Sequence, residues 1–259
     1  MLVEGMNVGE INTAIYRDYN IILDSSTLIR LENSYLDQRR KFKIQKDDSY
    51  PVFYSIKTKA KNNWILMVEK HLESKSVKTI NDVRTAFFTY YHTRKGYRVF
   101  NPCAGTTLLV YNGHMFTRFR ERMHLTISDP IDIIKHFFAT NFSPVKQRMD
   151  KDGQGNVLFM SIEKDGYLMG NVQEYSDKII WYVHKTFISG SIASFRQITY
   201  TNKLKLNAAK DLLKFRIGDI KELSDLTNEY CNLFGFMDKE VTIDFLKHLI
   251  EDMEKQSSK

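Results

Sequence analysis

The chain lacks any long hydrophobic run, and no stretch approaches the roughly 18 apolar residues that a membrane-spanning helix needs. Its N-terminal segment has neither the basic region nor the hydrophobic region of a secretory signal. Cysteine is scarce, since Cys103 and Cys231 are the only two. Two thiols are too few for a disulfide scaffold, so the sequence predicts a cytoplasmic protein with reduced cysteines and no membrane partner.

Proline is also rare, at four residues in 259, and no Pro/Ser-rich linker divides the chain. The seven histidines include no HExxH motif and no Cys/His pairing at zinc spacing, so no metal site is predicted. Phosphate loops of the GxxxxGK[ST] or GxGxxG type and the GxSxG nucleophile motif are missing too. The sequence therefore predicts no cofactor and excludes the enzyme classes that these motifs define.

The residues that are present describe an ordinary folded protein. Hydrophobic residues make up 42% of the chain, charged residues 27% and aromatic residues 13%, which is far from the composition of a disordered protein. The 38 Lys and Arg outnumber the 31 Asp and Glu, for a net charge of +7. This modest excess is compatible with a polyanionic partner such as RNA but does not require one.

The spacing of apolar residues predicts an α+β fold in three parts. These parts are an N-terminal helical extension over 1–48, an α+β core over 49–205 and a helical C-terminal region over 206–259. The core is expected to contain a mainly antiparallel sheet and two central helices. The helices are expected over 27–44, 112–123 and 130–140, and the strands over 50–57, 64–69, 86–93, 97–100, 108–111, 157–163, 167–173 and 179–189.

Two parts of this scheme stay open. Residues 80–91 also fit a helical face through Ile80, Val83, Phe87 and Tyr91, although their aromatic content favours a strand. The apolar series in the C-terminal region is typical of amphipathic helices, which could dock a protein partner.

The helix expected over 112–123 carries the clearest candidate site. Projected at 100° per residue, its apolar side chains form one stripe, and His114, Arg118 and Arg122 form a second stripe beside it. Two arginines offer planar sets of donors to phosphate oxygens, and a nearby histidine suits a general base. The competing interpretation is a solvated basic shoulder on an amphipathic helix, which the spacing alone favours.

The strand expected over 179–189 carries a second group of candidates. Strict alternation places two sets on opposite faces: Ile179, Trp181, Val183, Lys185 and Phe187 toward the core, and Ile180, Tyr182, His184, Thr186 and Ile188 away from it. Tyr182, His184 and Thr186 can bind a phosphate or move a proton. The competing interpretation is a half-exposed strand, where Tyr and Thr are common.

Taken together, the H-x3-R-x3-R helix and the Thr-bearing strand resemble the barnase/RelE-like endoribonuclease superfamily over about residues 110–190. The resemblance implies a metal-independent endoribonuclease in which the 2′-hydroxyl of RNA is the nucleophile. This chain is much longer than the compact members, and Met115 stands where they carry a small residue. The alternative is a non-catalytic protein that binds nucleic acid or a protein on a nuclease-like fold.

The resemblance also implies a role for each candidate residue. His114 would be the base or acid, Arg118 and Arg122 would stabilise the phosphorane, Thr186 would orient the phosphate, and His184 or Tyr182 would be the second proton-transfer group.

Two further basic clusters, at 38–46 and 92–98, interleave cations with an aromatic residue. Proteins that bind single-stranded nucleic acid combine the same residue types. Charged residues at a helix end or a hairpin tip are more often simply solvated, so each cluster alone is weak support for a nucleic-acid contact.

Overall fold

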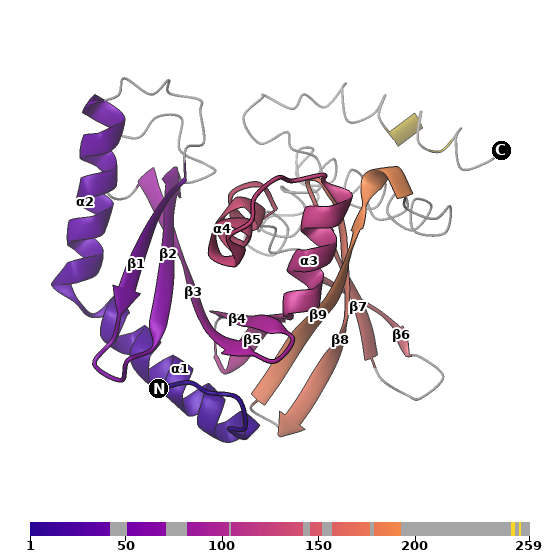
Figure 1. Cartoon of the computed structure of the whole chain (residues 1–259), viewed down its shortest axis with the longest axis horizontal. Coiled ribbons are helices and arrows are strands. Elements are labelled where there is room, and N and C mark those ends of the chain that lie inside the picture. The colour runs from indigo at the N-terminus through magenta and orange to yellow at the C-terminus, as the bar shows by residue number, and fades with distance from the viewer. Residues whose placement is uncertain are drawn as a thin grey trace.

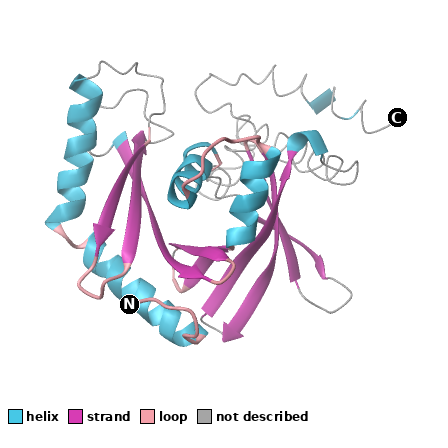
Figure 2. Ribbon diagram, viewed as in Figure 1, coloured by secondary structure: helices cyan, strands magenta, loops and turns pink. Residues whose placement is uncertain are grey.

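The computed structural model describes residues 1–41, 51–70, 82–103, 105–141, 146–151, 157–176, 179–192, 250–251 and 254. Within these residues the chain forms one nine-stranded sheet with helices packed on both of its faces (Figures 1 and 2). The α+β class is therefore confirmed. In the same part of the chain, no helix combines the length and the apolar character needed to cross a bilayer.

The sheet consists of two antiparallel meanders. The first contains β1 (Val52–Lys57), β2 (Asn63–Lys70), β3 (Val83–Thr93), β4 (Gly96–Pro102) and β5 (Thr107–Tyr111). The second contains β6 (Lys146–Lys151), β7 (Val157–Glu163), β8 (Gly166–Ser176) and β9 (Ile179–Ser189). In each meander, strands that are consecutive in the sequence are neighbours in the sheet, as short turns favour.

The meanders join through β5 and β9, which run parallel. The strand order is therefore β1-β2-β3-β4-β5-β9-β8-β7-β6, and the sheet is mixed although mostly antiparallel. Helices α3 (Gly113–Arg122) and α4 (Pro130–Thr140) follow β5 and lie where the sequence predicts helices. Asp129 begins α4 as its N-cap, and its carboxylate accepts hydrogen bonds from the amides of Ile131 and Asp132.

The N-terminal region differs from the prediction. One helix was expected over 27–44, whereas the structure has α1 (Val8–Leu23) and α2 (Ser26–Lys41). A capping box starts α1, because Asn7 accepts a hydrogen bond from the Glu10 amide while the Glu10 carboxylate accepts one from the Asn7 amide. Both helices pack against the sheet face opposite α3 and α4.

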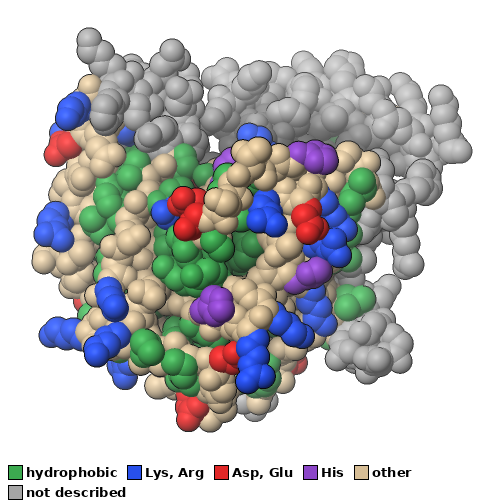
Figure 3. Space-filling view, viewed as in Figure 1, with side chains coloured by type: hydrophobic (Ala, Val, Ile, Leu, Met, Phe, Trp, Pro, Cys, Tyr) green, Lys and Arg blue, Asp and Glu red, His purple; other side chains and the backbone are tan. Residues whose placement is uncertain are grey.

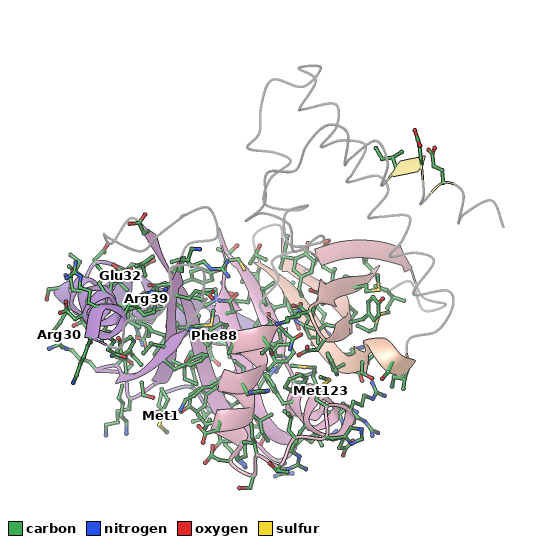
Figure 4. All side chains as sticks on the ribbon, turned by 90° about the horizontal axis from the view of Figure 1, so that it is seen from above. Met1, Arg30, Glu32, Arg39, Phe88 and Met123 are labelled. Carbon is green, nitrogen blue, oxygen red and sulfur yellow. The ribbon has the colours of Figure 1, made fainter. Side chains whose placement is uncertain are left out.

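Each face of the sheet carries its own core. Along β2, Trp64 and Leu66 pack with α1, whereas Ile65 and Met67 belong to the core under α3 and α4. Because the strands between these layers are buried on both sides, they carry continuous apolar runs in place of a clean polar alternation. Phe88 of β3 is fully buried and stacks on Phe138 of α4 at 3.9 Å between ring centroids (Figure 4).

Strand pairing decides one of the alternatives left open by the sequence. Residues 83–93 form a strand that pairs with β2 and β4, so the helical alternative for this segment is wrong over the described residues. Residues 146–151, for which the sequence predicted no element, form β6 and pair with β7. The predicted C-terminal helices fall on 206–259, of which only residues 250–251 and 254 are described, all three as helical.

The alternation along β9 is interrupted at Lys185, which corrects the predicted faces of this strand. His184 pairs with Gly170 and Thr186 with Met169, so Lys185 is an extra residue in a β-bulge. Phe187 consequently lies on the same side of the sheet as His184 and faces α3. Its ring centroid is 5.1 Å from that of Phe119. Thr186, next to Phe187, faces the opposite side.

Candidate nucleic-acid interface

The exposed side of α3 carries His114 and Arg118. Nε of Arg118 donates to Nε2 of His114 at 3.4 Å, and its Nη1 lies 2.9 Å from Oε2 of Glu121. The side chains of Arg118 and Glu121 are 44% and 46% exposed, so water screens this ion pair and it contributes little to stability. A phosphate could therefore replace Glu121 as the partner of Arg118 at little cost.

Arg122 continues the same row at the end of α3 and is half-buried. Its Nη1 is buried and has no hydrogen-bond acceptor in the part of the chain that the structure describes. The helix thus keeps all three predicted residues on one side of its apolar stripe, which is formed by Met115, Phe116 and Phe119.

The candidates on β9 lie elsewhere. His184 is fully buried, its ring stacks on Tyr111 at 4.2 Å with an interplanar angle of 2°, and its Nδ1 lies 3.1 Å from the carbonyl oxygen of Val110. Tyr182 is half-buried and meets Phe159 edge to face at 5.3 Å. His184 therefore belongs to the packed core, out of reach of a large substrate.

The structure does not bring the six predicted residues into one cleft. His114 and Arg118 are exposed on α3, whereas His184 is buried against the rings of Tyr111 and Phe159. Thr186 faces the other side of the sheet because of the bulge at Lys185. An arrangement in which Thr186 orients a phosphate held by the α3 arginines does not form.

A contact that sequence reasoning missed places a second basic segment beside α3. The turn between β3 and β4 rests against the start of this helix, where a Cβ on Gly113 would lie 2.6 Å from the carbonyl oxygen of Lys95 and 3.1 Å from Cα of Gly96. The cluster at 92–98 and the row on α3 are therefore neighbours. Gly113 was the available signal, since a glycine at a helix start permits such a close backbone approach.

We refer to this combined area as the basic surface, and define it by Arg94, Lys95, His114, Arg118 and Arg120. All except the half-buried Arg120 are exposed. Figure 3 shows Lys, Arg and His side chains gathered over and beside α3 on one face of the molecule. The N-cap residue Asn112 makes no side-chain hydrogen bond to the first turn of α3, so the positive end of the helix dipole also faces this area.

A small pocket opens within the basic surface, between the β3–β4 turn, α3 and the first turns of α4. It has a volume of about 150 Å³, and its lining includes His92, Tyr97, Phe116, Thr117, Arg120 and Ile133. The rings of His92 and Tyr97 meet edge to face at 5.2 Å. Phe116 and Ile133 are buried and form its apolar floor, whereas His92 and Thr117 are exposed.

A larger cavity of about 440 Å³ lies apart from this area and shares no lining residue with the pocket. It forms where β3 separates from β4, since the two strands pair only from Thr89 to Thr93 of β3. Its lining includes Tyr19, Arg84, Phe87, Asn101, Leu109 and Tyr182. In this lining, Nη2 of Arg84 already forms an ion pair with Oε1 of Glu69 at 2.6 Å. Figure 3 shows a hollow lined by hydrophobic side chains in the middle of its face.

Metal ligands do not gather at either site. Among the described residues, no group of three or more His, Cys, Asp or Glu side chains is arranged to hold a metal ion.

No protein-family model, curated protein or solved structure matches this chain. The functional argument therefore rests on the geometry of the basic surface and its pocket.

Proposed function

We propose that the chain is an RNA-binding protein and that its basic surface binds the phosphates of the RNA. The observation that carries this proposal is the contact between the β3–β4 turn and the start of α3 at Gly113. This contact joins two basic segments into one surface, although they lie about twenty residues apart in the sequence. A continuous row of cations is the electrostatic footprint that a nucleic-acid backbone requires.

The chemistry of the side chains supports phosphate binding. Arg94, Lys95 and Arg118 are exposed donors of one charge, and two carboxylates lie beside them: Glu121 on α3, and Glu4, whose Oε2 accepts a hydrogen bond from the Arg94 amide at 3.3 Å. The ion pair between Arg118 and Glu121 is solvent-screened and easily exchanged for a phosphate contact. The uncapped start of α3 adds partial positive charge at the same place.

Binding is better supported than cleavage. Cleavage through a 2′-hydroxyl needs two groups that transfer protons at the same phosphate. His114 is exposed on α3, but His184 is fully buried and Thr186 faces the opposite side of the sheet. Of the two groups that the superfamily resemblance implies for the second proton transfer, His184 is fully buried and Tyr182 is half-buried against Phe159, so neither is as accessible to RNA as His114.

A metal-independent endoribonuclease remains the second candidate, because one contact favours it. Nε of Arg118 lies 3.4 Å from Nε2 of His114, which places an imidazole beside a guanidinium. That pair suits a general base next to a phosphate-binding group. The test is RNA cleavage in EDTA by the wild type and by His114→Ala. Cleavage by the wild type alone would support the enzyme, and cleavage by neither would exclude it for the RNAs tested.

Fluorescence anisotropy with a labelled single-stranded RNA tests the binding proposal. We expect Arg118→Gln to weaken binding about three- to tenfold and to reduce the slope of log K against log salt by about 0.7 for one lost phosphate contact. Glu121→Gln should strengthen binding, because it removes the competing carboxylate.

Arg30→Gln is the matched control, since it removes the same charge from an exposed position on α2. Figure 4 places Arg30 far from Met123, which follows α3. If Arg30→Gln weakens binding as much as Arg118→Gln, the attraction is non-specific and the proposed surface is wrong. If the wild type binds no RNA, the RNA-binding proposal is wrong and a protein becomes the expected partner of this surface. The predicted docking of a protein through C-terminal helices falls mainly outside the described residues.

A further inference from the structure

We propose that the pocket within the basic surface holds one unpaired nucleobase of a single-stranded RNA. This inference rests on the proposed function and deepens it, because it names the part of the RNA that the protein recognises. The pocket lies between the β3–β4 turn, α3 and α4, and Gly96 and Tyr97 in its lining follow directly after Arg94 and Lys95 of the basic surface. A strand bound by Arg94 and Lys95 would pass beside the pocket.

The size of the pocket limits its occupant to a single flat ring system. Its volume of about 150 Å³ is well below the 300 Å³ or more of a typical drug-sized ligand site. Neither a complete nucleotide cofactor nor a peptide segment would fit inside it. One planar base, whose sugar and phosphate stay outside on the basic surface, matches the space.

The walls and the floor suit an aromatic ring. The rings of His92 and Tyr97 meet edge to face with their centroids 5.2 Å apart. Tyr97 also packs edge to face with Tyr90, at 5.4 Å between centroids. Phe116 and Ile133 close the floor with apolar side chains. Stacking on aromatic side chains is the principal way in which proteins hold bases of single strands, because every base has a π-face.

The polar groups of the pocket indicate which base edge would be bound. Arg120 can only donate hydrogen bonds, and the hydroxyl of Thr117 already donates to the carbonyl oxygen of Gly113 at 3.2 Å. Uracil presents two keto oxygens to the guanidinium, whereas each amino edge of adenine offers one ring-nitrogen acceptor beside the amino donor, so uracil suits Arg120 better. Base-paired RNA would not bind in this way, since its bases are stacked inside the duplex.

The test compares two ligands that differ only in the presence of bases. Binding of oligo(U) and of an abasic oligoribonucleotide of equal length is measured by anisotropy competition. We expect the wild type to prefer oligo(U) about tenfold, which is the usual scale for one stacked base. In Tyr97→Leu the ratio of the two affinities should fall toward one, while Tyr97→Phe, which keeps the ring, should retain the preference. Arg120→Gln should reduce the preference for oligo(U) over oligo(A).

Each outcome bears on the proposal. If the wild type binds both ligands equally well, RNA binding stands and the base pocket is wrong. If it binds neither, the proposed function fails and this inference fails with it. Because Tyr97 packs against Tyr90, the thermal unfolding of Tyr97→Leu is measured as well, and Arg120→Gln provides a second variant that leaves the aromatic packing in place. A preference that survives both substitutions would overturn the assignment of the pocket.

Discussion

Tyr16 links α1 to the chain between β4 and β5. Its hydroxyl lies 3.0 Å from the carbonyl oxygen of Cys103 and 2.6 Å from that of Thr107, and it donates to this pair. Burial raises the pKa of Tyr16 well above its ordinary value, and the Cys103 thiol raises it further. The folded state therefore favours the neutral phenol and resists its ionisation.

This pKa shift predicts a loss of stability in alkaline solution. Because the pKa is higher in the folded than in the unfolded chain, the stabilisation is fully present below about pH 10 and is lost as the pH rises above that value. Tyr16→Phe should cost about 1 kcal/mol at neutral pH and should flatten the decline above pH 10. Urea unfolding of both proteins at neutral and alkaline pH measures this effect.

Tyr175→Phe is the comparison for that experiment. Tyr175 is 45% exposed, so solvent screens its ionisation and its substitution should alter the alkaline decline less than Tyr16→Phe does. An unchanged alkaline slope in Tyr16→Phe would contradict the expectation.

The sequence predicted the helix face of the α3 residues correctly but assigned the faces of β9 wrongly, because of one bulged residue. The 100° spacing correctly placed His114 and Arg118 beside the apolar stripe, since a helix has a fixed period. Strict alternation placed Thr186 with His184, but the bulge at Lys185 separates them. A bulge depends on pairing with β8, which no local pattern of β9 reveals.

At the scale of elements, turn residues were the most reliable signal. Arg94-Lys95-Gly96 is typical of a hairpin turn and joins the strands expected over 86–93 and 97–100, and Asp165-Gly166 joins those expected over 157–163 and 167–173. The strands β2 and β5 are buried on both faces, so their apolar runs identify strands but not which side faces which helix. Helix α1 was missed, although Asn7 and Glu10 carry the spacing of a capping box.

Gly113→Ala tests the packing of the β3–β4 turn against α3. The new Cβ would lie 2.6 Å from the Lys95 carbonyl oxygen, so the turn or the helix must shift. We expect a loss of about 1–3 kcal/mol in the free energy of unfolding, together with weaker RNA binding, because the two halves of the basic surface move apart. Chemical denaturation and RNA anisotropy on the same samples measure both effects.

Gly9→Ala controls for helix propensity. Its Cβ would meet only Asn7 Oδ1 at 3.4 Å, within the first turn of α1. This substitution should leave stability unchanged or raise it by up to about 1 kcal/mol, with RNA binding unaffected. Weakened RNA binding in Gly9→Ala, or full binding in Gly113→Ala, would contradict the proposed role of the contact.

At the scale of the whole molecule, the sequence indicates the class of the fold but not its arrangement. Each hairpin is formed by residues close together in the chain, and the strands of the β1–β2, β3–β4 and β7–β8 hairpins lie where the sequence predicts strands. The parallel pairing of β5 with β9 is of another kind, since Thr107 aligns with Ile180 across the segment that contains α3, α4 and β6 to β8. No local signal in either strand selects that partner.

The parallel seam has a consequence for how the chain folds. All other strand pairs are local in the sequence, so each meander can form early. The pairing of β5 with β9 closes a long loop, which costs chain entropy. Docking of the two meanders should therefore be the last and slowest step. The two tryptophans report on this order, because Trp64 is in the first meander, Trp181 is in the second, and each is 1% exposed.

Single-tryptophan variants make the order measurable. Trp181→Phe leaves Trp64 as the reporter of the first meander, and Trp64→Phe leaves Trp181 as the reporter of the seam strand β9. In stopped-flow refolding we expect Trp64 to reach part of its native fluorescence in a faster phase than Trp181. One common rate for both reporters would show that the meanders fold as a single unit. Separate rates would mean that this molecule assembles from two halves, with β5 and β9 as the last strands to pair.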